Sequence, residues 1–360
     1  MQLTLALSVV VPVRNSASSL DKVLAAVRAS DLAVDAYEII VVDDASTDAS
    51  VTVAARQADT VVRLSGRSAG PAYARNRGAE LARGEVVAFL DADVLVRPDT
   101  LPRMLAMLVE RLDIDAVSAS HDERPGASNF VSQYWNLLLC FGEARHGGEC
   151  AHFATGCGAI RRSALLSAGM YDEWRFSVGC VESLELGQRL VGAGHGVVLS
   201  SELKVMHLKR WTVRSMCLEV WRRSMLLARS LGYQRMSSAA PGDVVFTLSR
   251  ALTPALAILG TLTLTAAFIP RPYAAAKVVL AGAALLLTNL PVHRYYAHAR
   301  GVGFALASAP LHLFVQGITA VALCAGWILR DAVGDVLPDA ATQAYSEVGL
   351  ETWPPVRRRP

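Results

Sequence analysis

The sequence predicts an α/β domain with a mostly parallel sheet, followed by a C-terminal region embedded in a membrane. The first observation is that, up to about residue 120, short apolar runs alternate with segments of helical spacing. The second is that the chain becomes almost continuously apolar after about residue 244, in keeping with 52% hydrophobic residues and a mean hydropathy of +0.33. The chain of 360 residues is long enough for a soluble domain and a membrane region together.

The α/β part is expected to alternate strands and helices in order. Runs of β-branched and large apolar residues with no polar face are typical of strands buried on both sides, and they predict strands at 8–13, 37–42, 60–64, 86–90 and 114–120. Apolar residues at helical spacing predict the helices between them, at 18–29, 49–58, 71–83 and 98–112. A further strand is expected at 196–200.

Polar residues follow three of these strands at the point where each ends: Asn15, the pair Asp43 and Asp44, and Asp91 with Asp93. In open α/β sheets, ligands lie outside the carboxyl ends of the strands. Asp91 and Asp93 share one face of an extended segment, so both carboxylates can address one ligand, and they suit Mg²⁺ or Mn²⁺ bridging a diphosphate. The alternative is a solvated turn.

The loop 67–70 leads into a helix N-terminus, where backbone N–H groups favour a phosphate, although taken alone an ordinary surface turn or cap is the more frequent explanation. The net charge of +3, without a basic stripe, gives no indication of nucleic acid. Six cysteines without a C-x-x-C pair argue against zinc and indicate reduced thiols. Residues 1–8 lack the features of a signal peptide.

Four segments together resemble the family 2 glycosyltransferases: 10–15 (VVPVRN), 41–48 (VVDDASTD), 70–78 (GPAYARNRG) and 89–93 (FLDAD). The resemblance covers about residues 7–215 and implies a GT-A fold, a Rossmann-like nucleotide-diphospho-sugar transferase fold. It also implies a nucleotide-sugar donor, a divalent metal and inversion at the anomeric carbon. Residues 155–162 look like the family's strand and turn on the acceptor side.

The resemblance also implies roles for single residues. Asp44 matches a contact to the nucleobase or ribose, Asp91 and Asp93 match the metal motif, and His207 stands where a histidine completes the metal shell or contacts the diphosphate. The other residues expected at the donor are Pro12, Arg14, Asn15, Arg67, Gly70, Arg75 and Asn76.

The chain departs from the family at Ser183. Members usually carry Glu-Asp where this chain has Glu182 and Ser183, and that Asp is the base that deprotonates the acceptor. Because a serine hydroxyl is not a base without a partner, either Glu182 or Glu185 does this work, or activity is reduced or lost. The alternative for Glu185 is a helix charge beside Arg189, its i+4 partner.

The second half predicts a membrane protein. Residues 211–231 form a basic amphipathic segment that suits an anionic membrane surface, or else a helix docked on the soluble domain. Spans are expected at 245–269, 273–292 and 304–329. Positive charge beside them places the catalytic domain in the cytoplasm, on a multi-pass protein of the cell (inner) membrane. The predicted domains are therefore 1–240, 244–330 and a disordered tail, 331–360.

The sequence thus predicts a membrane-anchored, metal-dependent, inverting glycosyltransferase acting on a lipid, a lipid-linked molecule or a cell-envelope glycan. A phosphate acceptor would already be ionised and would tolerate Ser183. One rival is a catalytically impaired homologue that serves as a partner subunit. The other is a nucleotide-regulated transporter, which the lack of internal repeats and intramembrane carboxylates disfavours.

Overall fold

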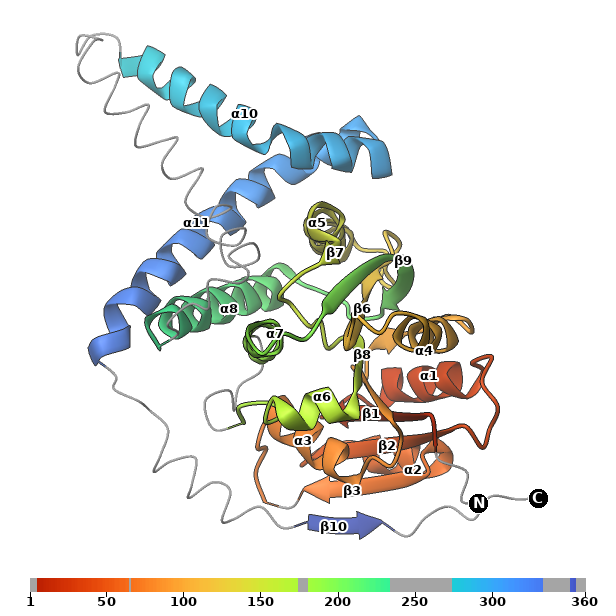
Figure 1. Cartoon of the computed structure of the whole chain (residues 1–360). Helices are drawn as coiled ribbons and strands as arrows, with labels where there is room; N and C mark the ends of the chain where they lie inside the picture. The colour runs from red at the N-terminus through yellow and green to blue at the C-terminus, as the bar shows by residue number, and fades with distance from the viewer. Residues whose placement is uncertain (1–4, 65, 174–180, 234–273, 333–349, 354–360) are drawn as a thin grey trace.

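The computed structural model describes residues 5–64, 66–173, 181–233, 274–332 and 350–353, and Figure 1 shows the whole chain. The strands are β1 (Leu7–Val13), β2 (Tyr37–Asp44), β3 (Thr60–Leu64), β4 (Val86–Leu90), β5 (Val94–Leu95), β6 (Ala116–His121), β7 (Gly148–Glu149), β8 (Cys157–Arg161), β9 (Val197–His207) and β10 (Leu350–Trp353). The helices are α1 (Ala17–Arg28), α2 (Ser50–Gln57), α3 (Pro71–Leu81), α4 (Thr100–Glu110), α5 (Phe130–His146), α6 (Arg162–Ser167), α7 (Glu182–Gly192), α8 (Val213–Tyr233), α10 (Ala274–Arg300) and α11 (Val302–Ala332).

The expected order of strands and helices is confirmed, with ends that differ by a few residues. Strands β3, β2, β1 and β4 are neighbours in that order and all parallel, as predicted. Beyond β4 the sheet is mixed, because β8 runs antiparallel between β4 and β6. Strand β9 is longer than expected and carries His207 at its end.

Two apolar clusters cover the two faces of this sheet. Alternate residues of one strand face opposite ways, so in β1 Val9 and Val11 join one cluster while Val10 joins the other. Helices α1, α2 and α4 complete the first cluster, and α3, α6 and α7 complete the second. The strand sequences are apolar throughout because both faces of the sheet are buried.

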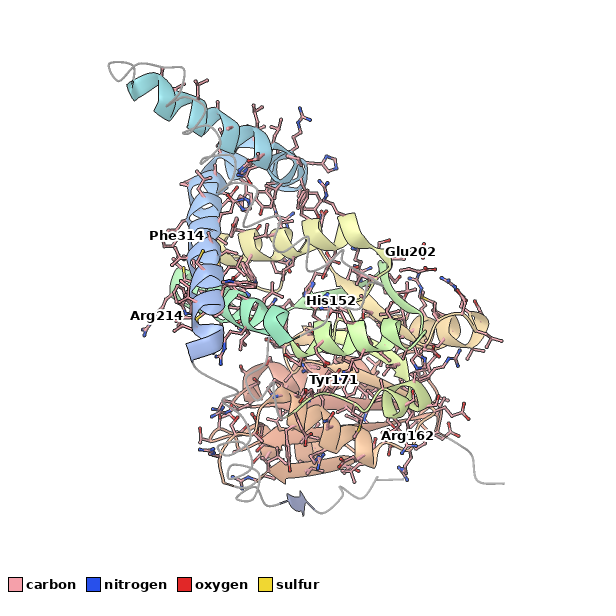
Figure 2. The ribbon with its side chains drawn as sticks, turned by 60° about the vertical axis from the view of Figure 1, so that its left-hand side comes forward. His152, Arg162, Tyr171, Glu202, Arg214 and Phe314 are labelled. Carbon is pink, nitrogen blue, oxygen red and sulfur yellow. The ribbon has the colours of Figure 1, made fainter. Side chains whose placement is uncertain are left out.

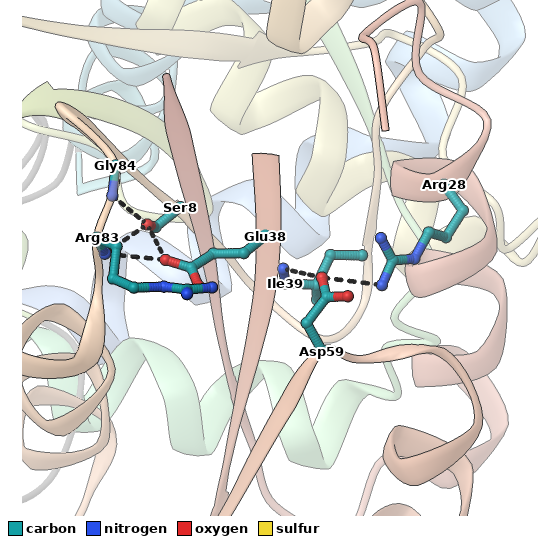
Figure 3. Close-up of polar contacts among 7 residues, drawn as sticks. All are labelled: Ser8, Arg28, Glu38, Ile39, Asp59, Arg83 and Gly84. Atoms are coloured by element: carbon teal, nitrogen blue, oxygen red, sulfur yellow. Dashed lines mark hydrogen bonds and ion pairs between the residues drawn. The ribbon is translucent and has the colours of Figure 1, made fainter. Parts of the chain in front are cut away.

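The amino ends of the strands are closed by a buried carboxylate, Glu38 (Figure 3). Its Oε1 accepts hydrogen bonds from the Ser8 hydroxyl (2.7 Å) and the Arg83 backbone N–H (2.9 Å), and its Oε2 pairs with the Arg83 guanidinium at 2.6 Å. The backbone N–H of Gly84 donates to Ser8 Oγ at 2.9 Å. A Cβ on Gly84 would lie 2.6 Å from the backbone of Leu7, so this close approach requires glycine.

A second carboxylate at this end of the sheet is Asp59, which directly precedes β3 (Figure 3). It accepts from the Ile39 backbone N–H at 2.8 Å and pairs with Arg28 at 3.0 Å. Both sites join a strand to a helix or a loop across the chain. They stabilise the fold at the end of the sheet opposite to the polar strand ends singled out above.

Helices α5, α8, α10 and α11 share a third cluster, which includes Tyr134, Trp211 and Tyr296. Within it the Tyr134 hydroxyl lies 2.9 Å from His312 Nδ1, and His312 Nε2 lies 3.2 Å from Asn289 Oδ1. These contacts join α5, in the predicted transferase domain, to the C-terminal helices. Helix α5 is therefore the element of the predicted transferase domain on which the C-terminal helices dock.

The multi-pass prediction is not supported. Among the described residues one helix segment, Val302–Leu329, is long and apolar enough to cross a membrane. The span predicted at 273–292 falls within α10, whose length of 27 residues includes Lys277, Asn289 and Pro291 and which does not qualify. The span predicted at 245–269 lies outside the described residues.

The predicted interfacial segment is helix α8, and one of its faces packs against α11. Met216, Val220 and Leu227 are buried on that face. A Cβ on Gly326 of α11 would lie 2.6 Å from the backbone oxygen of Met225, so the two helices touch closely. This face packs on a C-terminal helix, so the membrane-surface interpretation and the alternative of a helix docked on the soluble domain both stay predictions. The other face exposes arginines together with apolar side chains: Arg214, Leu218, Trp221, Arg222 and Arg223.

The prediction of a disordered tail is wrong for four residues. Leu350–Trp353 form β10, which pairs antiparallel with β3, for example Leu350 with Leu64. The edge of β3 offered unpaired backbone groups that an extended segment can satisfy. The low periodicity of the tail gave no sign of this pairing. Residues 333–349 and 354–360 lie outside the described residues.

Candidate functional site

The ends of β1 and β2 form one side of the site. Asn15 and Ala45, which follow these strands, both have positive φ, 50° and 55°, so the chain turns sharply at the strand ends. Asn15 Oδ1 accepts from the Thr47 backbone N–H at 2.8 Å, and the Asn15 N–H donates to Ser46 Oγ at 2.9 Å. These bonds fix the two turns to each other.

Asp44 holds the loop that enters α3. Its carboxylate accepts from the Ser68 hydroxyl (2.6 Å) and from the backbone N–H groups of Ala69 (2.7 Å) and Gly70 (3.0 Å). Gly70 has φ 95°, a left-handed conformation that favours glycine. Both oxygens of Asp44 are thus engaged by loop residues. The predicted contact of Asp44 to a nucleobase or ribose stays a prediction.

A buried guanidinium joins two of the predicted site carboxylates. Arg75 lies on α3, and its Nη2 is 2.9 Å from Asp91 Oδ1 while its Nη1 is 2.9 Å from Glu182 Oε1. Burial opposes the charge of Arg75, yet Asp91 and Glu182 raise its pKa above the ordinary value. The structure therefore brings Arg75, Asp91 and Glu182 together from three separate parts of the chain.

Asn76, the next residue, turns away from this group. Its amide donates to the Tyr171 backbone oxygen at 2.9 Å and to Glu173 at 2.6 Å. It lines a cavity of 410 Å³ together with residues of the chain before and within α7: Gly169, Tyr171, Asp172, Glu173, Glu185 and Arg189. The contacts of Asn76 hold α3 against this segment, and its predicted role at the donor stays a prediction.

Asp93 and His207 face each other across β5 and β9. Val94 pairs with His207 in the sheet, and His207 Nε2 lies 3.7 Å from Asp93 Oδ1. Burial and the neighbouring charge of Asp91 raise the pKa of Asp93 to about 6. Burial, with the nearby His121, lowers the pKa of His207 to about 3. His207 is therefore neutral at pH 7 and has a lone pair to offer.

The donor set at this edge fits a divalent cation. Two carboxylates and a neutral imidazole are oxygen and nitrogen ligands that Mn²⁺ accepts, and Mg²⁺ is held in proteins by one or two carboxylates plus substrate phosphates. Burial, and after it the negative charge of Asp91, raise the pKa of Asp93, and a cation bound there would favour its charged form. Within the described part of the chain, no group of three or more His, Cys, Asp or Glu residues is already spaced to hold an ion.

Pro12, Arg14 and Arg67 surround the same edge. Pro12 is half-buried in β1 opposite Val42, and Arg14 and Arg67 are exposed beyond the strand and in the loop before α3. Their predicted contacts to a donor stay predictions. Pro12 and Arg14 lie at the carboxyl end of β1, and Arg67 lies in the loop that follows β3.

Two polar residues of α7 have contacts that bear on the missing base. Glu185 pairs with Arg189 at 2.5 Å, as the helix-charge alternative predicted. Ser183 Oγ lies 3.4 Å from His152 Nε2. His152 was missed in the sequence, because a single histidine in a segment without periodicity carries no motif. Only the fold brings it to the start of α7.

Comparison with known proteins agrees with this architecture. Residues 8–169 match the family described as Glycosyl transferase family 2. The chain is 40% identical over 109 residues to the succinoglycan biosynthesis protein ExoO of Rhizobium meliloti (strain 1021), covering 30% of this chain and 29% of that protein. It is 35% identical over 151 residues to the undecaprenyl-phosphate 4-deoxy-4-formamido-L-arabinose transferase of Pseudomonas aeruginosa (strain LESB58), covering 40% of this chain and 44% of that protein.

These matches span less than half the length of either relative. Among solved structures, the chain is similar to the mannosyltransferase PcManGT of Pyrobaculum calidifontis in complex with GDP-Man and Mn²⁺. The TM-score is 0.59 and the identity 21%, over 87% of this chain and 88% of that one. This similarity establishes the GT-A fold.

Proposed function

We propose that this chain, whose residues 8–169 match the family described as Glycosyl transferase family 2, transfers a sugar, with inversion, from a nucleotide-diphosphate donor to a membrane-associated acceptor. The observation that carries the proposal is the carboxyl edge of the sheet. There Asp93 lies 3.7 Å from His207, and Asp91, two residues before Asp93, pairs with Arg75, which also pairs with Glu182. That edge suits a diphosphate held through a cation.

Asp91, Asp93 and His207 would hold Mn²⁺ or Mg²⁺, and the ion would neutralise the diphosphate as it leaves. Arg75 fixes the orientation of Asp91. Burial and its neighbours keep His207 neutral, so it can bind as a ligand without first losing a proton. The loop anchored by Asp44 sets the N-terminus of α3, where backbone N–H groups favour phosphate oxygens.

The acceptor is proposed to be a lipid, a lipid-linked molecule or a cell-envelope glycan. One relative is named for undecaprenyl phosphate, a lipid phosphate. Helix α11 supports a membrane location for this chain, because Val302–Leu329 is apolar and 28 residues long. Large apolar side chains are exposed along it: Leu306, Phe314, Val321, Trp327 and Ile328. A catalytic domain on the cytoplasmic side of the inner membrane stays a prediction.

The deprotonation of a hydroxyl acceptor is the step of the reaction that the predicted residues explain least. Glu182 holds the buried Arg75, and Glu185 holds Arg189. Each carboxylate would have to give up an ion pair to take a proton. Their assignment as the base stays a prediction. The rival function, an impaired homologue that serves as a partner subunit, is favoured by one observation, Ser183 at the start of α7.

The proposal is tested with the full chain purified in detergent. Hydrolysis of a panel of nucleotide sugars is measured with Mn²⁺, with Mg²⁺ and with chelator, and we expect metal-dependent release of nucleoside diphosphate from one class of donor. Calorimetry with that nucleoside diphosphate should show Mn²⁺-dependent binding that Asp93→Ala abolishes. Glu149→Ala, at an exposed position, is the matched control. Equal nucleotide affinity with and without Mn²⁺ would overturn the assignment.

A further inference from the structure

We propose that His152 is the general base that deprotonates a hydroxyl acceptor, with Ser183 positioning its ring. The proposal rests on the transferase function given above. His152 Nε2 lies 3.4 Å from Ser183 Oγ, at the long end of hydrogen-bond distances, and such contacts often tighten only when substrate is bound. Figure 2 shows His152 in the middle of the molecule, close to α7.

The segment that carries His152 runs directly into the proposed metal site. Four residues after His152, the Gly156 backbone oxygen accepts from the Asp91 N–H at 3.0 Å. A Cβ on Gly156 would lie 3.7 Å from Asp91 Oδ2. Residues 152–156 therefore lead from the imidazole to the carboxylate that faces the donor.

The helix that carries Ser183 reaches the same carboxylate by a separate path. Glu182, its neighbour, pairs with Arg75, and Arg75 pairs with Asp91. Two connections, one through Gly156 just before β8 and one through Glu182 of α7, thus lead to Asp91. The His152–Ser183 contact joins these two segments, four residues before Gly156 on one and one residue after Glu182 on the other.

The contact between the two segments is built into the packing. Gly187 lies one helical turn after Ser183, on the same face of α7. A Cβ on Gly187 would lie 2.4 Å from the Ala151 oxygen and 2.6 Å from the Phe153 nitrogen. Ala151 and Phe153, which flank His152, are both buried, while His152 itself is half-exposed. The backbone is therefore fixed on both sides of a side chain that solvent can reach.

The chemistry of this histidine suits the task better than that of the two carboxylates. An imidazole ordinarily titrates near pH 6.5, close to the pH at which a general base operates best. Taking a proton at His152 breaks neither ion pair of α7. The Ser183 hydroxyl holds Nε2 of the resting ring at 3.4 Å, and an acceptor hydroxyl would replace Ser183 at that nitrogen when it binds.

The step balances without any further reactant. The acceptor oxygen forms a bond to the anomeric carbon as its O–H bond breaks, and the proton passes to His152 Nε2. The bond from the anomeric carbon to the diphosphate oxygen breaks, and its electron pair leaves with the diphosphate. His152 then returns the proton to water before the next turnover.

The test uses the full chain, one accepted donor and a hydroxyl acceptor. We expect His152→Gln and His152→Ala to lower turnover by about 10²–10⁴-fold, the range for loss of general-base catalysis. The binding of nucleoside diphosphate with Mn²⁺ should stay within about twofold. The acidic limb of the pH–rate profile should disappear, and added imidazole should restore part of the turnover of His152→Ala.

Ser183→Ala should have a smaller effect, about tenfold or less, and should keep the acidic limb. His298→Gln, an exposed histidine on α10, is the matched control and should behave as wild type. Thermal unfolding of each variant separates loss of the base from loss of the fold, and imidazole rescue shows the base directly.

Full turnover of His152→Gln would overturn the proposal, as would a loss of turnover with an unchanged pH profile and no rescue. A variant Glu182→Gln that loses the acidic limb while His152→Gln keeps it would return the role to Glu182. Failure of the proposed function looks different: the wild type then binds no nucleoside diphosphate and hydrolyses no donor, and the base assignment falls with it.

Discussion

The two ends of the central sheet differ in how their carboxylates are paired with arginines. At the amino end, Glu38 has Arg83 as its own arginine and Asp59 has Arg28 as its own. At the carboxyl end, one buried arginine, Arg75, is shared by two carboxylates. At the amino end each carboxylate is therefore neutralised by an arginine of its own. At the carboxyl end two negative charges share one positive charge.

The difference extends to the neighbouring groups. Ser8, Ile39 and Arg83 supply neutral N–H and O–H donors to the amino-end carboxylates. At the other end, Asp93 has a pKa raised to about 6 by burial and by Asp91. One oxygen of the fully buried Asp43 has no hydrogen-bond partner in the described part of the chain. A surplus of this kind is costly in a protein interior, so it indicates an end of the sheet that is completed by a ligand.

The variant Asp91→Asn tests most directly whether the two ends of the sheet differ in function. Removing this charge should lower turnover by roughly 100-fold or more, because the proposed metal ion would lose one of the residues that would hold it at the diphosphate. Asp59→Asn at the amino end is the matched control, and it should leave turnover of the folded protein within about twofold. Steady-state kinetics of both variants at saturating Mn²⁺ is the measurement. Similar losses in the two variants would mean that the two ends do not differ in function.

Arg75→Met should have the largest effect on stability. It leaves Glu182 buried without its arginine, and removing one partner of a buried pair costs about 3–5 kcal/mol. Replacing both partners, in Arg75→Met with Glu182→Leu, should recover part of this loss. Denaturant unfolding of the single and double variants measures the coupling. An unaltered midpoint for Arg75→Met would show that water or protonation of Glu182 compensates for the lost arginine.

Glu38→Gln should cost less, about 1–3 kcal/mol, because the amide can still accept one hydrogen bond while the second oxygen is lost. Arg83 is largely exposed and regains water, so no buried charge remains. Nucleotide binding should not change. Calorimetry and thermal unfolding of the same preparation test both halves of this statement, and weaker nucleotide binding would contradict the structural role of this end.

The sequence predicted the α/β domain well because strands buried on both faces read as unbroken apolar runs. It also placed Asp91, Asp93 and Asp44 at one edge, since those residues follow strands directly. The contacts of Arg75 with Asp91 and Glu182 could not be predicted, because they join positions that are 16 and 107 residues apart along the chain. His152 near Ser183 depends on how α7 packs at Gly187.

The C-terminal part was harder for a different reason. Hydropathy measures composition, and it does not show that α8 and α11 pack together or that His312 and Asn289 are paired with polar neighbours. The pairing of β10 with β3 depends on an open sheet edge, which no local pattern in residues 350–353 reveals.

Asp93→Asn is expected to have the smallest effect and the opposite sign. The folded-state pKa of Asp93, about 6, lies above its ordinary value of 3.8. The folded state therefore binds more protons than the unfolded state between these values, and stability falls as pH rises through this window. Above about pH 6 the penalty is fully present, and below about pH 4 it is absent. The amide removes it, so at pH 8 the variant without metal should be more stable by on the order of 1 kcal/mol.

With metal and nucleotide bound, wild type should become more stable than Asp93→Asn. Mn²⁺ with nucleoside diphosphate stabilises whichever protein binds it, by an amount that grows with the ratio of ligand to Kd. Wild type should gain thermal stability with these ligands at pH 8, and Asp93→Asn should gain little. At pH 4 the metal-free proteins should unfold at nearly the same temperature. Unfolding curves at the two pH values, with and without Mn²⁺, give all four comparisons. A variant that is less stable than wild type without metal at pH 8 would show that Asp93 is balanced within the chain, as Glu38 is at the opposite end.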